Sequence, residues 1–473
     1  MNADWRPTLS GDDRTLYEQL LGVLLSDVRS GALPPGAKLP PQRELAHALG
    51  IGVGTVTRVY AEAERRGLLA AHVGRGTFVA DAGGPHADPR GAFGFAPGPA
   101  DGVIDLARNI PPIGPAHERI REALTRLGRR GDLVDALTYG PPAGHPASRA
   151  AAAQWLMRRH GLGPLAADEI ILCGGGQQAL AVAVAALCRP GDAVLCEAAT
   201  FVGVKALAEH QGLRLRGVAL DAEGLVPDAL DRAAAASGAR LLYTIPSLQN
   251  PTGAIMSETR RRDILAVARA RELTIIEDDV YAVYARAAGM TAPSLRDLAP
   301  DRTWHVASVS KSLAPGLRLG FLLPPPGAAR ESAVRGMRAT TYAPPALSAL
   351  IVAQWIEDGS ADAIADAVVD EVEARVALAR AILGPARVDP GAPACLHLWM
   401  PMSELEAERA AGRALRQGVE LTPPRAPIVA PDLMSGLRLC VGGPADQTAL
   451  ERGLRTVAAA LSPDTEEPSQ PFV

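Results

Sequence analysis

Near the start of the chain, apolar residues recur every three or four positions in three successive segments. This spacing is typical of amphipathic helices and predicts them at 16–28, 42–49 and 53–66. Gly31, Gly50 and Gly67 follow these segments, and glycine readily ends a helix. Two short apolar runs in 68–80 flank Gly74-Arg75-Gly76, which predicts a β-hairpin. The pattern over 12–80 is therefore three helices followed by a hairpin.

Farther along the chain, short apolar runs alternate with helical segments. Such alternation is typical of βαβ units, in which mainly parallel strands form one sheet with helices on both faces. We expect strands at 170–173, 193–196, 213–220, 241–245, 274–276, 304–308 and 320–323. From about residue 344 the pattern changes to a long helix and two strand segments, 394–400 and 436–441, which predicts a smaller α+β domain.

A stretch rich in Gly, Pro and Ala separates the two patterns. It covers 83–99, has no hydrophobic period and is typical of a linker. The chain has 473 residues, and single hydrophobic cores stop growing at about 250 to 300 residues, so more than one domain is expected. We predict an N-terminal domain at 12–80, a linker at 81–104 and an α/β domain at 105–461.

Composition narrows the class of protein. Apolar residues make up 48% and charged residues 21% of the chain, which is ordinary for a globular protein. The longest apolar run, 179–188, is half of the roughly 20 residues that a membrane-spanning helix needs, and no apolar leader segment opens the chain. We therefore expect a cytoplasmic protein without a membrane partner. The five cysteines form no CxxC pair, which favours buried thiols over a metal site.

Three helices and a hairpin, in that order, make a winged helix-turn-helix. In this fold the third helix enters the major groove and the hairpin lies against the backbone or the minor groove. The net charge of −4 means that any DNA-binding surface is local. The sequence predicts a double-stranded DNA operator as a partner, and the alternative is an interaction module with solvated arginines. The candidate DNA-binding residues are Arg43, Thr55, Thr57, Arg58 and Arg75.

The α/β domain carries groups that an aldehyde cofactor with a phosphate tail requires. Such a cofactor needs a lysine for a Schiff base, an acid opposite the ring nitrogen, a donor to the ring oxygen, a stacking ring and a phosphate cup. Gly175, Gly176 and Gln177 open a helix after a predicted strand, where backbone N–H groups can bind phosphate, although glycine at such a turn is often only structural. Phe201 follows the next strand and can cover the ring, although a lone phenylalanine is more often core.

The remaining groups follow later strands. Asn250, just past 241–245, offers an amide to the ring oxygen, or forms a plain turn. Asp278 lies at the carboxyl edge of the sheet and would keep the ring nitrogen protonated, whereas a solvated acidic loop is the alternative for Glu277 and Asp279. The strongest signal is Lys311, which would form the Schiff base. The residues near it that can bind the phosphate are Ser308, Ser310 and Arg318.

Two resemblances join these motifs. Residues 39–79 resemble the winged helix of the GntR family of bacterial regulators, in the run LPPQRELAHALGIGVGTVTRVYAEAERRGLLAAHVGRGTFV. The cofactor groups, in their order, resemble fold type I aminotransferases over about 105–461. The second resemblance implies pyridoxal 5'-phosphate on Lys311, with Tyr281 beside Asn250 as a donor to the ring oxygen.

The aminotransferase resemblance implies two further residues. Tyr139 looks like the tyrosine that reaches the phosphate of the neighbouring subunit, and Arg438 looks like the arginine that binds a ligand carboxylate. A winged helix fused to this domain resembles the MocR/GabR subfamily of GntR regulators. That resemblance implies a homodimer and an amino-compound effector, or pyridoxal phosphate itself, sensed by Schiff-base exchange at Lys311.

Two alternatives stay open. One is a catalytically active aminotransferase with an accessory DNA-binding domain, because every catalytic group is present. The other is a sensor of the cofactor alone, against which Arg438 argues because it points to a carboxylate-bearing ligand.

Overall fold

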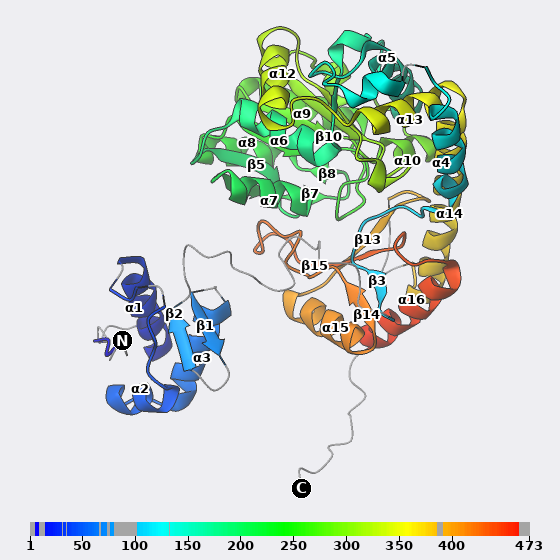
Figure 1. Ribbon diagram of the computed structural model, residues 1–473. Helices are drawn as coiled ribbons and strands as arrows, with labels where there is room; N and C mark the ends of the chain where they lie inside the picture. Colours follow the sequence, from blue (N-terminus) through cyan, green and yellow to red (C-terminus); the bar gives the residue numbers. More distant parts are fainter. Residues whose placement is uncertain are drawn as a thin grey trace. The chain divides into compact units, whose positions relative to one another are not determined.

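The computed structural model describes residues 5–8, 15–30, 32–34, 36–65, 68–72, 76–79, 102–131, 133–385 and 391–462. The chain folds into two compact units, 1–89 and 90–473, both drawn in Figure 1. Each unit has a hydrophobic core of its own.

The first unit contains three helices and a two-stranded antiparallel sheet. Its elements are α1 (Leu16–Ser30), α2 (Gln42–Leu49), α3 (Val53–Arg65), β1 (Leu69–His72) and β2 (Gly76–Val79). Helix α2 ends at Gly50, whose left-handed φ of 66° costs glycine little. The apolar faces of α1 and α3 share a core that includes Leu20, Leu24 and Val59. The winged helix-turn-helix expected from the hydrophobic pattern is confirmed.

The second unit is centred on a seven-stranded sheet with the order β4-β12-β11-β10-β9-β5-β6. Its pairs are parallel except those of β12, which runs antiparallel to β11 and β4. The expected mainly parallel sheet is confirmed, and the carboxyl ends of its parallel strands share one edge. The strands are β4 (Ile171–Cys173), β5 (Ala193–Glu197), β6 (Arg214–Val218), β9 (Leu241–Thr244), β10 (Thr274–Asp278), β11 (Thr303–Ser308) and β12 (Gly320–Leu323).

Helices pack around this sheet, as Figure 1 shows. Strands β9 and β11 are buried along their whole length, as is typical of strands covered on both faces of a mainly parallel sheet. In the described part of the chain, no helix combines the length and the apolar composition needed to cross a membrane. The helices are α4 (Gly114–Leu127), α5 (Pro146–Trp155), α6 (Gly176–Leu187), α7 (Val202–His210), α8 (Pro227–Ser237), α9 (Glu258–Ala270), α10 (Ala282–Ala287), α11 (Leu295–Leu298), α12 (Ala328–Thr340) and α13 (Ala346–Glu357).

A smaller subdomain completes the second unit. Strands β13 and β15 pair antiparallel, and β14 pairs parallel with β3. Strands β3 and β14 have three residues each, too few for a hydrophobic period to reveal them. Ile104, the last residue of the predicted linker, already begins β3, while 81–101 lie outside the described residues. The elements are β3 (Ile104–Leu106), α14 (Ser360–Leu383), β13 (His397–Pro401), α15 (Glu404–Arg416), β14 (Val419–Leu421), β15 (Gly436–Cys440) and α16 (Gln447–Leu461).

Two secondary-structure expectations were wrong. The long helix expected from about residue 344 is two helices, because Gly359 takes a left-handed φ of 78° between α13 and α14. The strand expected at 213–220 stops at Val218. The chain then forms a small hairpin of β7 (Leu220–Asp221) and β8 (Gly224–Leu225).

Candidate functional site

The glycine turn after β4 is tightly enclosed. Gly175 caps α6 with φ 91°, and a Cβ built on it would lie 2.6 Å from Nη2 of Arg318. A Cβ on Gly320 in β12 would lie 2.5 Å from the backbone of Gly175. Arg318 donates to the carbonyl of Gly174 at 3.3 Å, and the side chain of Gln177 donates to the carbonyl of Gly203 at 2.8 Å. Backbone and guanidinium groups therefore converge at the N-terminus of α6, a natural anion site.

The serines predicted to bind phosphate lie beside this turn. The hydroxyl of Ser308 donates to that of Ser310 at 2.8 Å, and the backbone N–H of Ser310 donates back to Ser308 at 3.0 Å. A Cβ on Gly176 would lie 3.6 Å from Cβ of Ser308. The structure thus brings Gly175, Gly176, Ser308 and Arg318 together.

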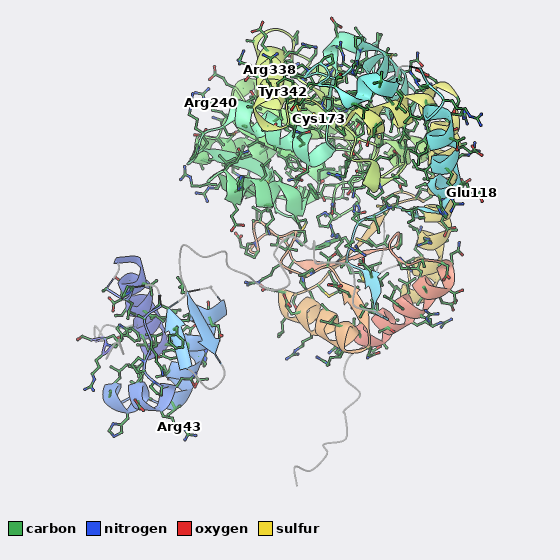
Figure 2. All side chains as sticks on the ribbon, viewed as in Figure 1. Arg43, Glu118, Cys173, Arg240, Arg338 and Tyr342 are labelled. Atoms are coloured by element: carbon green, nitrogen blue, oxygen red, sulfur yellow. The ribbon has the colours of Figure 1, made fainter. Side chains whose placement is uncertain are left out.

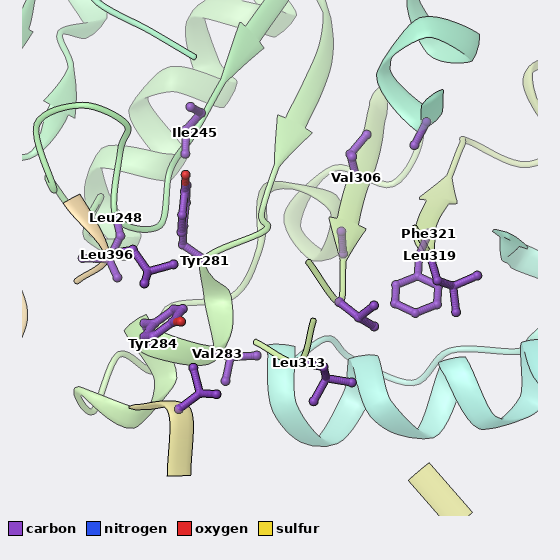
Figure 3. Packing of buried hydrophobic residues seen from close by; sticks show 14 of the residues in the cluster. Ile245, Leu248, Tyr281, Val283, Tyr284, Val306, Leu313, Leu319, Phe321 and Leu396 are labelled. Carbon is purple, nitrogen blue, oxygen red and sulfur yellow. The ribbon is translucent and has the colours of Figure 1, made fainter. Parts of the chain in front are cut away.

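Lys311 lies in the turn after β11. Its Nζ donates to the backbone carbonyl of Asn109, and its own carbonyl accepts a hydrogen bond from the hydroxyl of Tyr284. Figure 3 shows Tyr284 and Leu313 among the apolar side chains of this region. Burial lowers the pKa of Lys311 from 10.5 to about 8. A lowered pKa increases the share of neutral amine, the form that reacts with an aldehyde.

Asp278 ends β10 and is buried. Its Oδ2 accepts a hydrogen bond of 2.7 Å from the hydroxyl of Tyr243 in β9. Its Oδ1 is also buried and has no hydrogen-bond partner among the described residues. Burial raises the pKa of Asp278 to about 6, although Tyr243 and Lys311 act in the opposite direction. A buried carboxylate oxygen without a partner fits the protonated nitrogen of a bound ring.

Asn250, Tyr281 and Arg438 form one hydrogen-bonded group. The amide nitrogen of Asn250 donates to the hydroxyl of Tyr281 at 3.2 Å, and its Oδ1 accepts from Nη1 of Arg438 at 2.9 Å. Arg438, buried in β15, also donates to Oγ1 of Thr422 at 3.1 Å and to the carbonyl of Ala107 at 3.1 Å. The three predicted residues therefore lie in direct contact.

Phe201 is half-buried at the start of α7. A Cβ on Gly203 would lie 2.3 Å from the ring of Phe201 and 2.3 Å from the side-chain oxygen of Gln177. The missing side chain at Gly203 therefore leaves room for this ring beside the glycine turn. Phe201 packs against the main hydrophobic core, so it is both a core residue and a neighbour of the site.

The solvated loop considered for Glu277 and Asp279 is wrong. Both residues are buried, at 0% and 3% exposure. Glu277 accepts hydrogen bonds from the backbone of Leu295 and from His305. Burial acts to raise its pKa, but His305 and Arg261 outweigh this and hold the pKa below its usual value. Glu277 holds α11 against the sheet, because the backbone N–H groups of Leu295 and Arg296 both donate to its buried carboxylate.

Tyr139 lies on the surface of its own chain. It is 86% exposed, and its ring lies 4.9 Å from that of Tyr342, which Figure 2 labels. Val134 and Leu137 on the neighbouring short helix Leu133–Leu137 are also exposed, at 62% and 79%. An exposed aromatic and aliphatic patch of this kind is typical of an interaction surface.

The lysines other than Lys311 are Lys38 and Lys205. Nζ of Lys205 donates to the carbonyls of Arg425, Ala426 and Ile428 at 3.1, 2.7 and 2.6 Å. Nζ of Lys38 lies 5.9 Å from the centre of the Phe78 ring.

Three of the candidate DNA-binding residues are exposed on α2 and α3, namely Arg43, Thr57 and Arg58. Arg43 projects from α2 (Figure 2), and Arg58 is exposed on α3 with its guanidinium 5.2 Å from the centre of the Tyr17 ring. The hydroxyl of Thr57 donates to Oε1 of Gln42 at 2.8 Å, so it connects α3 to α2. Thr55 is half-buried in the first turn of α3. The predicted contact Arg75 lies outside the described residues.

Sequence reasoning missed four residues of these sites. Tyr243 could have been found, because a tyrosine in a buried strand needs a partner for its hydroxyl. The side-chain oxygen of Gln42 accepts a hydrogen bond from Thr57, so its amide nitrogen faces away from Thr57 and can donate to another group. Asn109 follows β3 and His397 begins β13, and their side chains are in contact although they lie far apart in the sequence. The motifs in the sequence do not predict this contact.

Comparison with known proteins agrees with this geometry. Residues 101–455 match the family of class I and II aminotransferases, and residues 16–79 match the gntR family of bacterial regulatory proteins. The chain is 32% identical over 321 residues to the uncharacterised HTH-type transcriptional regulator YdeF of Bacillus subtilis. That match covers 68% of this chain and 67% of YdeF. The chain is also 31% identical over 414 residues to the HTH-type transcriptional regulator TauR of Rhodobacter capsulatus, covering 80% and 81%.

The second unit is also similar to a solved aminotransferase structure. The α-aminoadipate aminotransferase LysN from Thermus thermophilus, crystallised with N-(5'-phosphopyridoxyl)-L-leucine, has a TM-score of 0.67 at 27% identity. The match covers 76% of this chain and 92% of that one. The second unit therefore has the fold of a pyridoxal-phosphate-dependent aminotransferase.

The chain belongs to the class I and II aminotransferase family, and joins that domain to a gntR-family helix-turn-helix in the MocR/GabR arrangement. Pyridoxal 5'-phosphate is the cofactor of this fold. The described residues fit it, because Oδ1 of Asp278 has no hydrogen-bond partner among them and the N-terminus of α6, which no side chain caps, begins beside Arg318.

Proposed function

We propose that this protein is a DNA-binding transcriptional regulator that uses pyridoxal phosphate to sense an amino compound or the cofactor itself. One observation carries the proposal: a gntR-type winged helix and an aminotransferase domain that contains Lys311, Asp278 and Arg438 occur in the same chain. Both relatives described above are named HTH-type transcriptional regulators, which supports this interpretation.

The ligand is best described as an amine that also carries a carboxylate. The bound aldehyde cofactor supplies reversible covalent capture of primary amines. Arg438 donates three of its five N–H groups to Thr422, Asn250 and Ala107. Of the remaining two, one lies on each terminal nitrogen, and this pair suits a carboxylate in fork geometry. An amino acid or similar compound therefore fits better than the cofactor alone.

Ligand binding acts through differential affinity. A ligand amine would compete with Lys311 for the cofactor, and its carboxylate would accept from the two remaining N–H groups of Arg438. Such a ligand shifts the protein between two states only as far as it binds one of them better. The proposed signal is the difference between Lys311 bound to the cofactor and Lys311 released.

The proposed regulator is a homodimer. Tyr139, Leu137 and Val134 form an exposed patch, and Tyr139 is the residue that would reach the cofactor phosphate of a neighbouring subunit. A dimer would cover this patch, and Tyr139 of one subunit would serve the site of the other.

A catalytically active aminotransferase is the second candidate. Lys311, with its pKa near 8, is an amine that can accept and return a proton close to neutral pH. Nothing in the arrangement of Asp278, Tyr281 and Arg438 separates this candidate from the regulator, so the test has to measure both activities.

Replacing Lys311 by alanine separates the two candidates. For the regulator, Lys311→Ala retains DNA binding, because the first unit has its own core, but transcription no longer responds to the effector. Wild-type protein is expected to show slow or absent multiple turnover. The measurements are transcription from the neighbouring promoter and transamination of a panel of amino acids, made side by side.

Lys205→Arg is the matched control, since it changes a lysine outside the site and keeps a cation near the three carbonyls. The control should behave as wild type in both assays. A wild-type kcat of about 1 to 10³ s⁻¹, together with transcription that Lys311→Ala leaves unchanged, would establish the enzyme and refute the regulator.

A further inference from the structure

His397 in β13 has a fixed hydrogen-bonding direction. Its Nε2 lies 3.0 Å from the backbone carbonyl of Gln249, which can only accept a hydrogen bond. Nε2 therefore carries the ring proton. Burial lowers the pKa of His397 to about 3, so the ring stays neutral and Nδ1 has no proton. Nδ1 can only accept.

The acceptor at Nδ1 of His397 fixes the orientation of the Asn109 side-chain amide. Nδ2 of Asn109 lies 3.0 Å from Nδ1 of His397 and 3.0 Å from the hydroxyl of Tyr281. Turning the amide over would place its oxygen against the lone pair of Nδ1, which is repulsive. The amide is therefore held with both N–H groups used, one on His397 and one on Tyr281.

Arg438 fixes the orientation of the Asn250 side-chain amide in a similar way. Nη1 of Arg438 can only donate, so Oδ1 of Asn250 faces it at 2.9 Å and Nδ2 faces the hydroxyl of Tyr281 at 3.2 Å. The oxygen of Tyr281 thus accepts from two amides. Its two lone pairs are occupied, and its hydrogen has to point in a third direction.

Tyr281 and Asp278 lie in one short segment at the carboxyl end of β10. Oδ1 of Asp278 suits the ring nitrogen of the cofactor, so Tyr281 is placed to face another atom of the same ring. We propose that His397 is a positioning residue that, through Asn109, makes Tyr281 an obligatory hydrogen-bond donor to the cofactor ring oxygen. This inference rests on the proposed placement of the cofactor at Lys311.

The expected consequence is spectroscopic. A donor to the ring oxygen stabilises negative charge on that oxygen, so the neighbouring nitrogen on Lys311 loses its proton at a lower pH. Burial keeps the thiols of Cys395 and Cys440 neutral, because it raises the pKa of both. The titratable and charged groups that act on Tyr281 or His397 include Asp278, Tyr243, Tyr284, Lys311, Cys395, Arg438 and Cys440.

The test is a pH titration of the visible absorption band of the cofactor in the full-length holoprotein. Tyr281→Phe removes the donor and should raise the midpoint by about one pH unit or more. His397→Phe and His397→Leu remove the acceptor that holds Asn109, and should raise the midpoint by at least half as much. His397→Gln keeps an acceptor and a donor, and should stay close to wild type.

Two comparisons exclude a merely structural role. His397→Phe should add nothing in a Tyr281→Phe background, because both changes remove the same donor. His160→Phe is the matched control, since His160 is buried and neither ring nitrogen has a partner among the described residues. Its midpoint should equal that of wild type.

Two results would overturn the proposal: a His397→Phe midpoint equal to that of wild type, or a shift that adds fully to that of Tyr281→Phe. If the wild-type protein itself has no titrating band, or if borohydride fixes the cofactor away from Lys311, the cofactor placement fails and the role of His397 with it. That failure is visible before any variant is made.

Discussion

Burial of Lys311 and Asp278 changes their acid–base behaviour in opposite senses. The amine loses affinity for its proton, with a pKa near 8, and the carboxyl group gains affinity, with a pKa near 6. Both shifts favour the neutral form, as desolvation requires. Between these two values the site contains a carboxylate and a largely protonated lysine, so capture of an aldehyde depends on the small neutral fraction of Lys311.

The rate of cofactor capture by cofactor-free protein should follow that fraction. As pH rises toward 8, more of Lys311 is neutral and the rate rises. Above about 8 it should level off. Stopped-flow absorbance after mixing with pyridoxal phosphate measures this rate at each pH.

A free lysine side chain, with a pKa of about 10.4, is the control, and its rate should keep rising past pH 9. Borohydride reduction followed by mass spectrometry should place the cofactor on Lys311. Cofactor on Lys38 or Lys205, or a capture rate that rises steadily to pH 10, would contradict the assignment.

Site residues could be predicted from the sequence where the cofactor requires one particular type of side chain. Lys311, Asp278 and Asn250 follow strands, and strand ends meet at one edge of a parallel sheet. Asn109 and His397 could not be predicted, because amide and imidazole groups have many uses and only the folded chain brings these two together. The roles of the predicted residues stay predictions until they are tested.

At the scale of elements, the hydrophobic pattern predicted several helices and strands at or close to their bounds. Helix α2 was predicted at 42–49, where the structure has it, and β12 at 320–323. The break at Gly359 escaped notice, because apolar residues continue on both sides and a single glycine does not interrupt the period. The three-residue strands β3 and β14 depend on each other, so tertiary pairing rather than local sequence creates them.

Helices α2 and α3 carry a prediction about DNA. Arg43→Ala and Arg58→Ala should each weaken binding to the operator by about 1 to 3 kcal/mol, because each removes a cationic donor. Binding should also fall steeply as salt increases. Fluorescence anisotropy with DNA from the upstream region of the gene, at two salt concentrations, measures both effects.

Arg240→Ala is the control, since Arg240 is an exposed arginine of the second unit, labelled in Figure 2, that pairs with Glu272. It should bind DNA as wild type does. Wild-type affinity in both Arg43→Ala and Arg58→Ala would show that the exposed polar side of α2 and α3 is not the DNA-binding surface.

At the scale of the whole molecule, we expect a dimer. Light scattering should give about twice the chain mass of 49.2 kDa. Leu137→Asp places a charge in the exposed patch next to Tyr139, and should shift the protein toward monomer and lower its affinity for the cofactor, because Tyr139 no longer reaches a neighbouring phosphate.

The comparison variant is Leu405→Asp, which alters another exposed leucine, on α15 in the smaller subdomain. It should remain dimeric. A dimer that persists in Leu137→Asp with unchanged cofactor affinity would place the subunit interface elsewhere.

The scarcity of lysine limits the nonspecific reaction of aldehydes with this protein. Aldehydes react with any accessible neutral amine, so a protein rich in lysine gives a large background of nonspecific capture. Here forty-five of the 48 basic residues are arginine, since Lys38, Lys205 and Lys311 are the only lysines. Lys205 directs its N–H groups at three carbonyls, and Lys38 lies against an aromatic ring. In the proposed sensor, the amine of Lys311 would be presented to the cofactor while that of Lys205 is held by three carbonyls, so little nonspecific capture is expected.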